Sequence, residues 1–342
     1  MMPAKMKNAV TPRRTVFVLA IGFVFLCISD PVLALAREAE GKSWHICVAK
    51  IVSHAALDAA EKGFEAGLAN AGFRTGVNVD FERHNANGDP ADAETIARKF
   101  AEGGCDLIHS IATPTTQSVL KFVKQTPVVF SAVTDPEAAG IVPRGSVPGN
   151  KTGMHVTGVS DKWPVHLQMQ TYAKFVPRAR VWGTVYNPAE DNSVSHVGEM
   201  RKAMKDLNLQ LIEVHATNAE EVKAATRSLV GQVQAIAITA DNTSVAHFKI
   251  IAEICNEHKI ALFAGDVDSV PNGAIAAYGT DYYLIGYSAG KKAGLILKGI
   301  EPGDIPWGLV EKFSLVINRR AAALQGVSID ADLLRKADRI FD

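Results

Sequence analysis

One local construction occurs twice in this chain, and it strongly limits the folds that the chain can adopt. An apolar strand runs into a short polar loop, and the loop opens directly into a helix. The first copy is 107–112 followed by 113–117 (TPTTQ), and the second is 235–239 followed by 240–244 (ADNTS). In an open α/β sheet such loops lie at the carboxyl ends of the strands, where ligands bind. We therefore expect two similar lobes that face each other across a cleft and capture a small polar molecule.

Strands and helices alternate along the rest of the chain. Helix-start signals such as Asp89-Pro90 follow several apolar runs. Alternation at this spacing indicates parallel sheets with right-handed crossovers. The pattern restarts after 150–163, so the fold class that we expect is α/β, with two doubly wound parallel-sheet lobes. The predicted strands are 44–52, 77–81, 107–112, 127–133, 180–185, 211–215, 235–239, 261–264 and 274–278.

The C-terminal part predicts how the two lobes are joined. Residues 282–297 form a helical pattern with Gly286, Gly290 and Gly294 on one face, which predicts very close packing onto a sheet, and 305–317 reads as a late strand. We assign this helix to the first lobe. The expected first lobe is then 44–160 with 281–303, and the second is 161–280 with 304–342. A chain that crosses between lobes several times forms a hinge, and a hinge permits closure around a ligand.

Residues 1–36 have the three-part layout of a secretory signal peptide. A basic start is followed by an apolar run over 16–28 and by the small-residue cleavage pattern Ala34-Leu35-Ala36. We expect cleavage near Ala36 and export to the periplasm. The apolar run is shorter than the roughly 20 residues of a membrane span, which argues against an anchor. Leu26 argues against lipid attachment at Cys27, and the Arg13-Arg14 pair leaves a twin-arginine signal as an alternative.

Charge and motifs narrow the class of function. Removing 1–36 from the 342 residues leaves 306, enough for two domains. The full chain has 36 basic and 36 acidic residues, and the removed segment holds four of the basic and one of the acidic ones. The mature net charge is therefore near −3. Neither a basic stripe for nucleic acid nor a polybasic membrane patch is present. The sequence has no phosphate loop, serine elbow or zinc pattern. We therefore expect no cofactor, no metal and no enzymatic activity.

Three cysteines remain in the mature chain: Cys47, Cys105 and Cys255. Cys47 and Cys105 each lie near the start of a predicted strand, and if those strands are neighbours a disulfide is open to them in an oxidising compartment. The interpretation that we favour is that the cysteines are buried free thiols that act as small hydrophobic residues.

Short motifs distributed over the mature chain resemble one family. In their order and spacing the chain is similar to the ABC transporter substrate-binding proteins of the tryptophan/tyrosine type, which have the type I periplasmic-binding-protein fold. One departure is Ala55, where the family usually has Pro. The motifs are 54–58 (HAALD), 112–117 (ATPTTQ), 133–140 (VTDPEAAG), 156–160 (VTGVS), 186–193 (YNPAEDNS), 240–243 (ADNT) and 265–266 (GD).

The resemblance implies a periplasmic receptor that delivers a small solute to an ABC permease in the inner membrane. Characterised relatives bind aromatic amino acids, so the implied ligand is an amino acid or aromatic acid that carries a carboxylate. We expect the receptor to be a monomer. One alternative is a ligand-binding sensor for a chemoreceptor or kinase. The other is an exported α/β enzyme, which the missing catalytic motifs disfavour.

Polar residues at the predicted strand ends are the candidate ligand contacts. Thr113, Thr115, Thr116 and Gln117 begin a helix, where free backbone N–H groups favour a ligand carboxylate. Ordinary helix capping is the alternative role for these residues. The other candidates from loops and strand ends are Ser53, His54, Thr134, Tyr186, Asn187, Asn192 and Ser193.

Three carboxylates close predicted strands and are candidate partners for a ligand ammonium group: Asp135, Asp241 and Asp266. Asp241 is the best of them because Asn242 and Thr243 add polar groups beside it. Capping or turn formation is the alternative for all three. Helix capping is likewise the alternative for Ser193. Tyr186 and Trp163 would form an aromatic wall for a planar ligand or, alternatively, part of the core.

Overall fold

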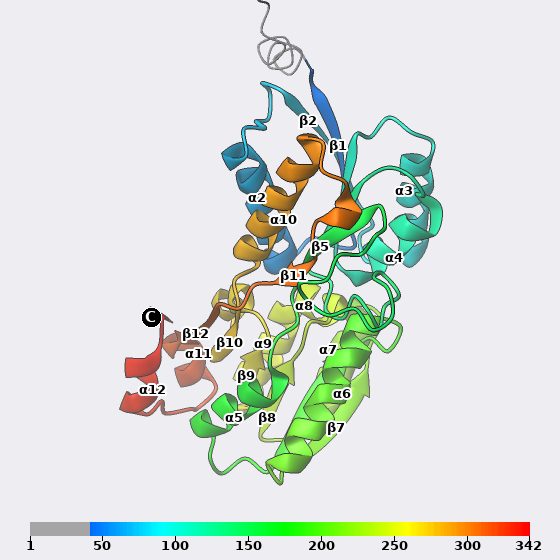
Figure 1. Cartoon of the computed structure of the whole chain (residues 1–342). Coiled ribbons are helices and arrows are strands. Elements are labelled where there is room, and N and C mark those ends of the chain that lie inside the picture. Colours follow the sequence, from blue (N-terminus) through cyan, green and yellow to red (C-terminus); the bar gives the residue numbers. More distant parts are fainter. Residues whose placement is uncertain (1–41) are drawn as a thin grey trace, which may run out of the picture. The chain divides into compact units, whose positions relative to one another are not determined.

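The computed structural model describes residues 42–342, so the predicted signal peptide lies outside the described residues. Ser43–Asp342 form one compact unit. Within this unit the strands build two mainly parallel sheets, each with its own helices (Figure 1). The predicted fold class, α/β with two doubly wound lobes, is confirmed. In the same residues we find no helix with the length and apolar character of a membrane span.

The first lobe is built on the sheet with the strand order β11-β5-β4-β3-β1-β2. Every strand pair in it is parallel. Parallel strands covered on both faces need continuous apolar runs, and β3 and β4 are buried along their whole length. The strands are β1 (Trp44–Lys50), β2 (Val79–Asn85), β3 (Leu107–Ile111), β4 (Val128–Ser131), β5 (Val156–Ser160) and β11 (Gly308–Leu309). The helices are α2 (Ala55–Asn70), α3 (Pro90–Ala101), α4 (Thr113–Phe122) and α10 (Tyr282–Leu297), with the short turn η2 (Pro302–Asp304).

The second lobe is built on the sheet with the strand order β13-β12-β10-β9-β8-β6-β7. Its strands are parallel except that β12 runs antiparallel to β10. The strands are β6 (Val181–Tyr186), β7 (Gln210–His215), β8 (Ala235–Ile238), β9 (Ala261–Ala264), β10 (Ala276–Thr280), β12 (Phe313–Asn318) and β13 (Arg339–Phe341). The helical segments are α5 (Val165–Phe175), α6 (Asp191–Asp206), α7 (Ala219–Ser228), α8 (Asn242–Ala246), α9 (Phe248–His258), η1 (Val267–Asn272), α11 (Arg319–Leu324) and α12 (Ala331–Lys336).

The described chain passes between the two sheets after β5, after β10 and after β11. The predicted single strand at 305–317 is wrong, because the exposed pair Glu311-Lys312 interrupts it. Its first part, β11, pairs with β5, whereas β12 pairs with β10. First-sheet pairing therefore extends to Leu309, beyond the boundary at residue 303 that we predicted. The division of the chain into two folding lobes stays a prediction.

The glycines of α10 pack against a helix, and not onto a sheet as we predicted. A Cβ on Gly286 would lie 1.8 Å from the carbonyl oxygen of Ala60 in α2, and one on Gly290 would lie 2.2 Å from that of Phe64. Gly63 and Gly67 of α2 approach the α10 backbone in the same way. The two helices lie side by side (Figure 1). Backbone-to-backbone contact of this kind holds α10 in the first lobe.

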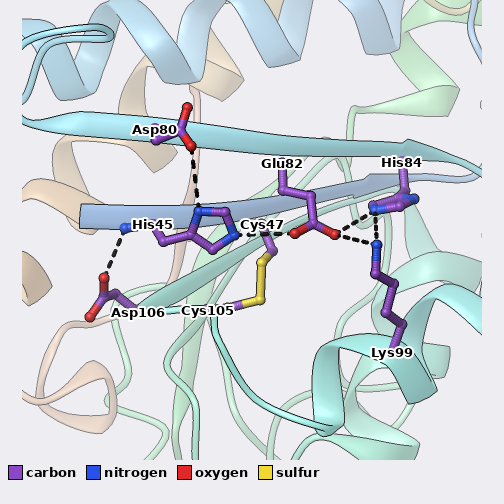
Figure 2. Close-up of a disulfide and its surroundings, with 8 residues drawn as sticks. All are labelled: His45, Cys47, Asp80, Glu82, His84, Lys99, Cys105 and Asp106. Atoms are coloured by element: carbon purple, nitrogen blue, oxygen red, sulfur yellow. Dashed lines mark hydrogen bonds and ion pairs between the residues drawn. A yellow bond between two sulfur atoms is a disulfide. The ribbon is translucent and has the colours of Figure 1, made fainter. Parts of the chain in front are cut away.

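Cys47 and Cys105 form a disulfide, with their Cα atoms 5.7 Å apart (Figure 2). The free-thiol interpretation that we favoured is therefore wrong for this pair. β1 and β3 are neighbours in the sheet, and Cys47 lies beside Ile108 in their register, which brings Cys105 within reach. Cys255 is a buried free cysteine, as that interpretation expected.

Candidate functional site

A small, partly enclosed cavity lies where the carboxyl ends of the two sheets meet. Its volume is about 10 Å³, roughly the room that one water molecule needs. Of the residues that we predicted, those that line it are His54, Thr134, Asn192, Asp241, Asn242 and Asp266. The other lining residues are Ala56, Leu57, Ala132, Asp161, Ala240, Val245 and Tyr282.

Three of the lining residues are aspartates, and all are almost fully enclosed: Asp161 is 3 % exposed, Asp241 0 % and Asp266 2 %. Burial raises the pKa of each of these carboxyl groups above its ordinary value. Among the described residues that line the cavity, none is lysine or arginine. The walls therefore favour a cationic guest, since a cation would stabilise the ionised carboxylates.

Asp161 lies on the first segment that crosses between the lobes. Thr134 donates a hydrogen bond to its Oδ1 at 2.9 Å, and the Tyr282 hydroxyl donates to its Oδ2 at 2.5 Å. Tyr282 begins α10, immediately after the second crossing. The hydrogen bond between them thus joins two crossing segments at the wall of the cavity. Asp266 follows β9 and caps η1, where it accepts hydrogen bonds from the backbone N–H and the hydroxyl of Ser269, both at 2.8 Å.

Asp241 follows β8 and caps α8, so the capping role considered from the sequence is present. It accepts hydrogen bonds from the Ser244 N–H at 2.5 Å, the Asn187 N–H at 2.7 Å and the Ser193 hydroxyl at 2.6 Å. Ser193 lies inside α6 and is not its cap. Asn187 and Ser193 therefore hold the Asp241 carboxylate and do not line the cavity.

Glu190 is a second buried carboxylate beside Asp241 and is not among the residues predicted from the sequence. Its oxygens accept hydrogen bonds from the side-chain amides of Asn192 and Asn242 and from the hydroxyl of Thr243. The backbone N–H groups of Asn242 and Thr243 also donate to it. Burial is the main cause that raises the pKa of Glu190 to about 7, and the nearby charge of Asp241 is the second. Glu190 thereby orders the α8 residues that line the cavity.

Aromatic side chains lie beside the aspartates. The Trp163 ring stacks on His196 at 4.6 Å between centroids and meets Tyr282 edge to face at 6.5 Å. Burial lowers the pKa of His196 to about 3. Burial likewise lowers the pKa of His54, which caps α2, to about 4. Both imidazoles are therefore neutral at pH 7 and add no positive charge to the site.

Four predicted residues gather at the start of α4 without lining the cavity. The hydroxyls of Thr113 and Thr115 are buried without a hydrogen-bond partner among the described residues. Thr116 donates to Ser110 and to the carbonyl of Ala112. Gln117 reaches across to the second lobe, where its amide donates to Asp191 of α6 at 2.7 Å. The α4 start is thus next to the lobe interface.

Three further predicted residues lie away from the cavity. Ser53 hydrogen-bonds to Asp58 near the surface. Asp135 is ion-paired with Lys162 at 2.9 Å. Tyr186, whose hydroxyl donates to Glu213 at 3.2 Å, is not among the residues that line the cavity.

The family model for ABC transporter substrate-binding proteins matches residues 45–341. The chain belongs to this family. Its members are solute-binding proteins rather than enzymes; they bind small molecules, work with ABC transporter permeases and typically act outside the cytoplasmic membrane. The family recognised from the sequence motifs is therefore confirmed.

Relatives at moderate identity extend over nearly the whole described chain. A tyrosine-binding protein of Clostridioides difficile is 33 % identical over 300 residues, covering 87 % of this chain and 86 % of that protein. A structure from Streptococcus pneumonia in complex with L-Trp is 28 % identical, with TM-score 0.82, covering 88 % of this chain and 100 % of that one. A ligand-free, open substrate-binding protein with adhesive properties from Clostridium difficile is 30 % identical, with TM-score 0.64, covering 87 % and 99 %.

Proposed function

We propose that this protein is a periplasmic receptor that binds an aromatic amino acid between its lobes and delivers it to an ABC permease in the inner membrane. The observation that carries the proposal is the convergence of Asp161, Asp241 and Asp266 on one cavity. Export through the predicted signal peptide is part of the proposal. The tyrosine and tryptophan named for two relatives support the ligand class.

The ligand ammonium group would bind among these aspartates. Each carboxylate already accepts hydrogen bonds from neutral donors, but no cation offsets its burial within the cavity wall. An ammonium group supplies both positive charge and N–H donors, and charge-assisted hydrogen bonds are the stronger kind. Its arrival would favour the ionised carboxylates, so binding should release protons wherever part of these groups is protonated.

The ligand carboxylate would bind at the start of α4. The N-cap position of this helix, Ala112, supplies no side-chain hydrogen bond, which leaves first-turn N–H groups for an anion. The partnerless hydroxyls of Thr113 and Thr115 would add donors. Tyr282 lines the cavity and Trp163 packs edge to face against it, and we assign both to the aromatic side chain.

Binding requires the lobes to move apart and close again. A cavity of about 10 Å³ is far smaller than an amino acid, so a ligand enters only when the lobes separate. At comparable identity the TM-score is 0.82 to the L-Trp complex and 0.64 to the open, ligand-free protein. This difference supports a closed arrangement for the described chain. The ligand would then act by shifting the population toward closed states.

Titration calorimetry with matched compounds tests the proposal. L-tyrosine and L-tryptophan should bind, and the des-amino analogue 3-(4-hydroxyphenyl)propionate should bind at least about tenfold more weakly, because it forfeits a hydrogen bond between charged groups. Tyramine, which lacks the carboxylate, should also bind more weakly. The variant Asp161→Asn should reduce the preference for L-tyrosine over the des-amino analogue, whereas the exposed control Asp92→Asn should not. Equal binding of all four compounds, or of none, would contradict the proposal.

A further inference from the structure

A second cluster of reactive side chains surrounds the disulfide, at the end of β1 opposite the cavity. His45 and Cys47 of β1 and Glu82 of β2 project from one face of the first sheet (Figure 2). One ligand atom of each, an imidazole nitrogen, the Cys47 sulfur and a carboxylate oxygen, lies within 4.8 Å of the other two. The Cys105 sulfur is bonded to that of Cys47. Two sulfurs, one imidazole and one carboxylate therefore meet at one point.

The distances suit a tetrahedral metal ion. Bonds of about 2.0–2.1 Å to nitrogen and oxygen place two such ligand atoms roughly 3.3 Å apart. The His45 Nε2 and the Glu82 Oε2 are 3.2 Å apart. Thiolate sulfurs need about 2.3 Å to zinc, which the 4.8 Å limit on the Cys47 sulfur allows after a small shift. A disulfide sulfur is not a thiolate, so this set is incomplete while the disulfide is intact.

Outer partners already orient the two ligands that are not sulfur. The Nδ1 of His45 faces a carboxylate oxygen of Asp80 at 3.8 Å, on the side away from Glu82. Metal-binding histidines commonly have a carboxylate at their second nitrogen. The other oxygen of Glu82 contacts His84 at 2.7 Å and Lys99 at 2.8 Å. This leaves the oxygen nearest His45 for a metal ion, although the Lys99 charge opposes a second cation.

We propose that reduction of the Cys47–Cys105 disulfide converts this cluster into a zinc-type site, with both cysteine thiolates, His45 and Glu82 as ligands. A dithiol reductant donates two electrons to the sulfur–sulfur bond and itself becomes a disulfide. The two sulfurs take up two protons and become thiols. Metal binding then releases both protons as the sulfurs bind as thiolates. The chain would therefore be able to bind the metal ion before its disulfide forms, but not afterwards.

Cobalt titration of the whole protein tests this inference, with Cys27→Ser/Cys255→Ser as the background so that no third thiol remains. After reduction by a phosphine and anaerobic removal of the reductant, one equivalent of Co²⁺ should produce the visible bands of tetrahedral cobalt and near-ultraviolet thiolate charge transfer. Zn²⁺ should abolish both signals. The oxidised protein should show neither. Equal spectra from oxidised and reduced protein, or no bands in the reduced protein, would overturn the proposal.

Two variants separate the site from nonspecific binding. His45→Gln should weaken cobalt binding by at least about tenfold, since even outer-shell changes have effects of that size. The matched control His166→Gln alters a half-exposed histidine of α5 and should have no effect. Circular dichroism would show whether the reduced protein stays folded. If it unfolds, Zn²⁺ should restore the fold, but not in Cys47→Ser/Cys105→Ser; failure to restore it would also overturn the proposal.

Discussion

Substitution of Gly286 by alanine should strongly destabilise the protein. The new Cβ would lie 1.8 Å from the Ala60 carbonyl oxygen, whereas real Cβ contacts below 3.0 Å are essentially never seen. The helices α2 and α10 would therefore have to separate by at least about 1.2 Å, the difference between these two distances. The obstacle is helix backbone, which cannot rotate away as a flexible side chain would. Every buried contact between the two helices would be loosened together.

The expected size follows from two opposing terms. Overpacking a well-filled interior costs about 1–3 kcal/mol and occasionally more, and we expect the upper end because backbone is displaced. Alanine recovers about 1 kcal/mol through its higher helix propensity. The net loss should therefore be about 2 kcal/mol in the free energy of unfolding. At roughly 2 °C per kcal/mol for a chain of this length, the melting temperature should fall by about 4 °C.

Urea unfolding followed by circular dichroism would measure the effect, with Gly198→Ala as the matched control. Gly198 lies inside α6, and a Cβ there would meet nothing within 4 Å. That substitution should raise stability by about 0.5–1 kcal/mol. The reasoning is refuted if Gly286→Ala is as stable as the parent protein or shifts in the same direction as the control.

Two further predictions concern the buried histidine of β3 and the disulfide. Burial lowers the pKa of His109 from 6.5 to about 3, so the unfolded chain takes up a proton below pH 6.5 that the folded protein refuses until about pH 3. Between pH 8 and pH 5 the free energy of unfolding should therefore fall by about 2 kcal/mol less in His109→Gln than in the parent protein. Urea unfolding at both pH values would measure this, and an equal fall in the two proteins would contradict it. Cys47→Ala/Cys105→Ala should lower the free energy of unfolding by about 4 kcal/mol, because the disulfide closes a loop with a sequence separation of 58; a loss below about 1 kcal/mol would refute the loop argument.

Strand-end reasoning singled out several residues that line the cavity, because their place depends on local topology. His54, Asp241 and Asp266 each follow a recognisable apolar run, and all three line the cavity. Asp161 obeys the same rule but was missed, because β5 (VTGVS) is too short and polar to be recognised as a strand. Its motif was visible, and treating that motif as a strand would have pointed to the residue after it.

Other parts of the site depend on contacts between distant segments. Tyr282 reaches Asp161 over a sequence separation of 121, and no local pattern indicates that contact. The hydrogen bonds to Glu190 likewise come from α8, a separate part of the second lobe. The glycines of α10 indicated a close approach correctly, but periodicity cannot say whether the partner is a sheet or a helix. The disulfide was equally beyond local reasoning, because cysteine spacing does not give a distance between Cα atoms.

The hydrogen bond between Tyr282 and Asp161 joins two of the segments that cross between the sheets. Because both residues also line the cavity, a solute bound there in the proposed way would touch directly the segments that bend when the lobes open. Solute preference and the ease of opening are then properties of the same few atoms. A change at either residue that admits a different solute should also alter how often the empty protein opens.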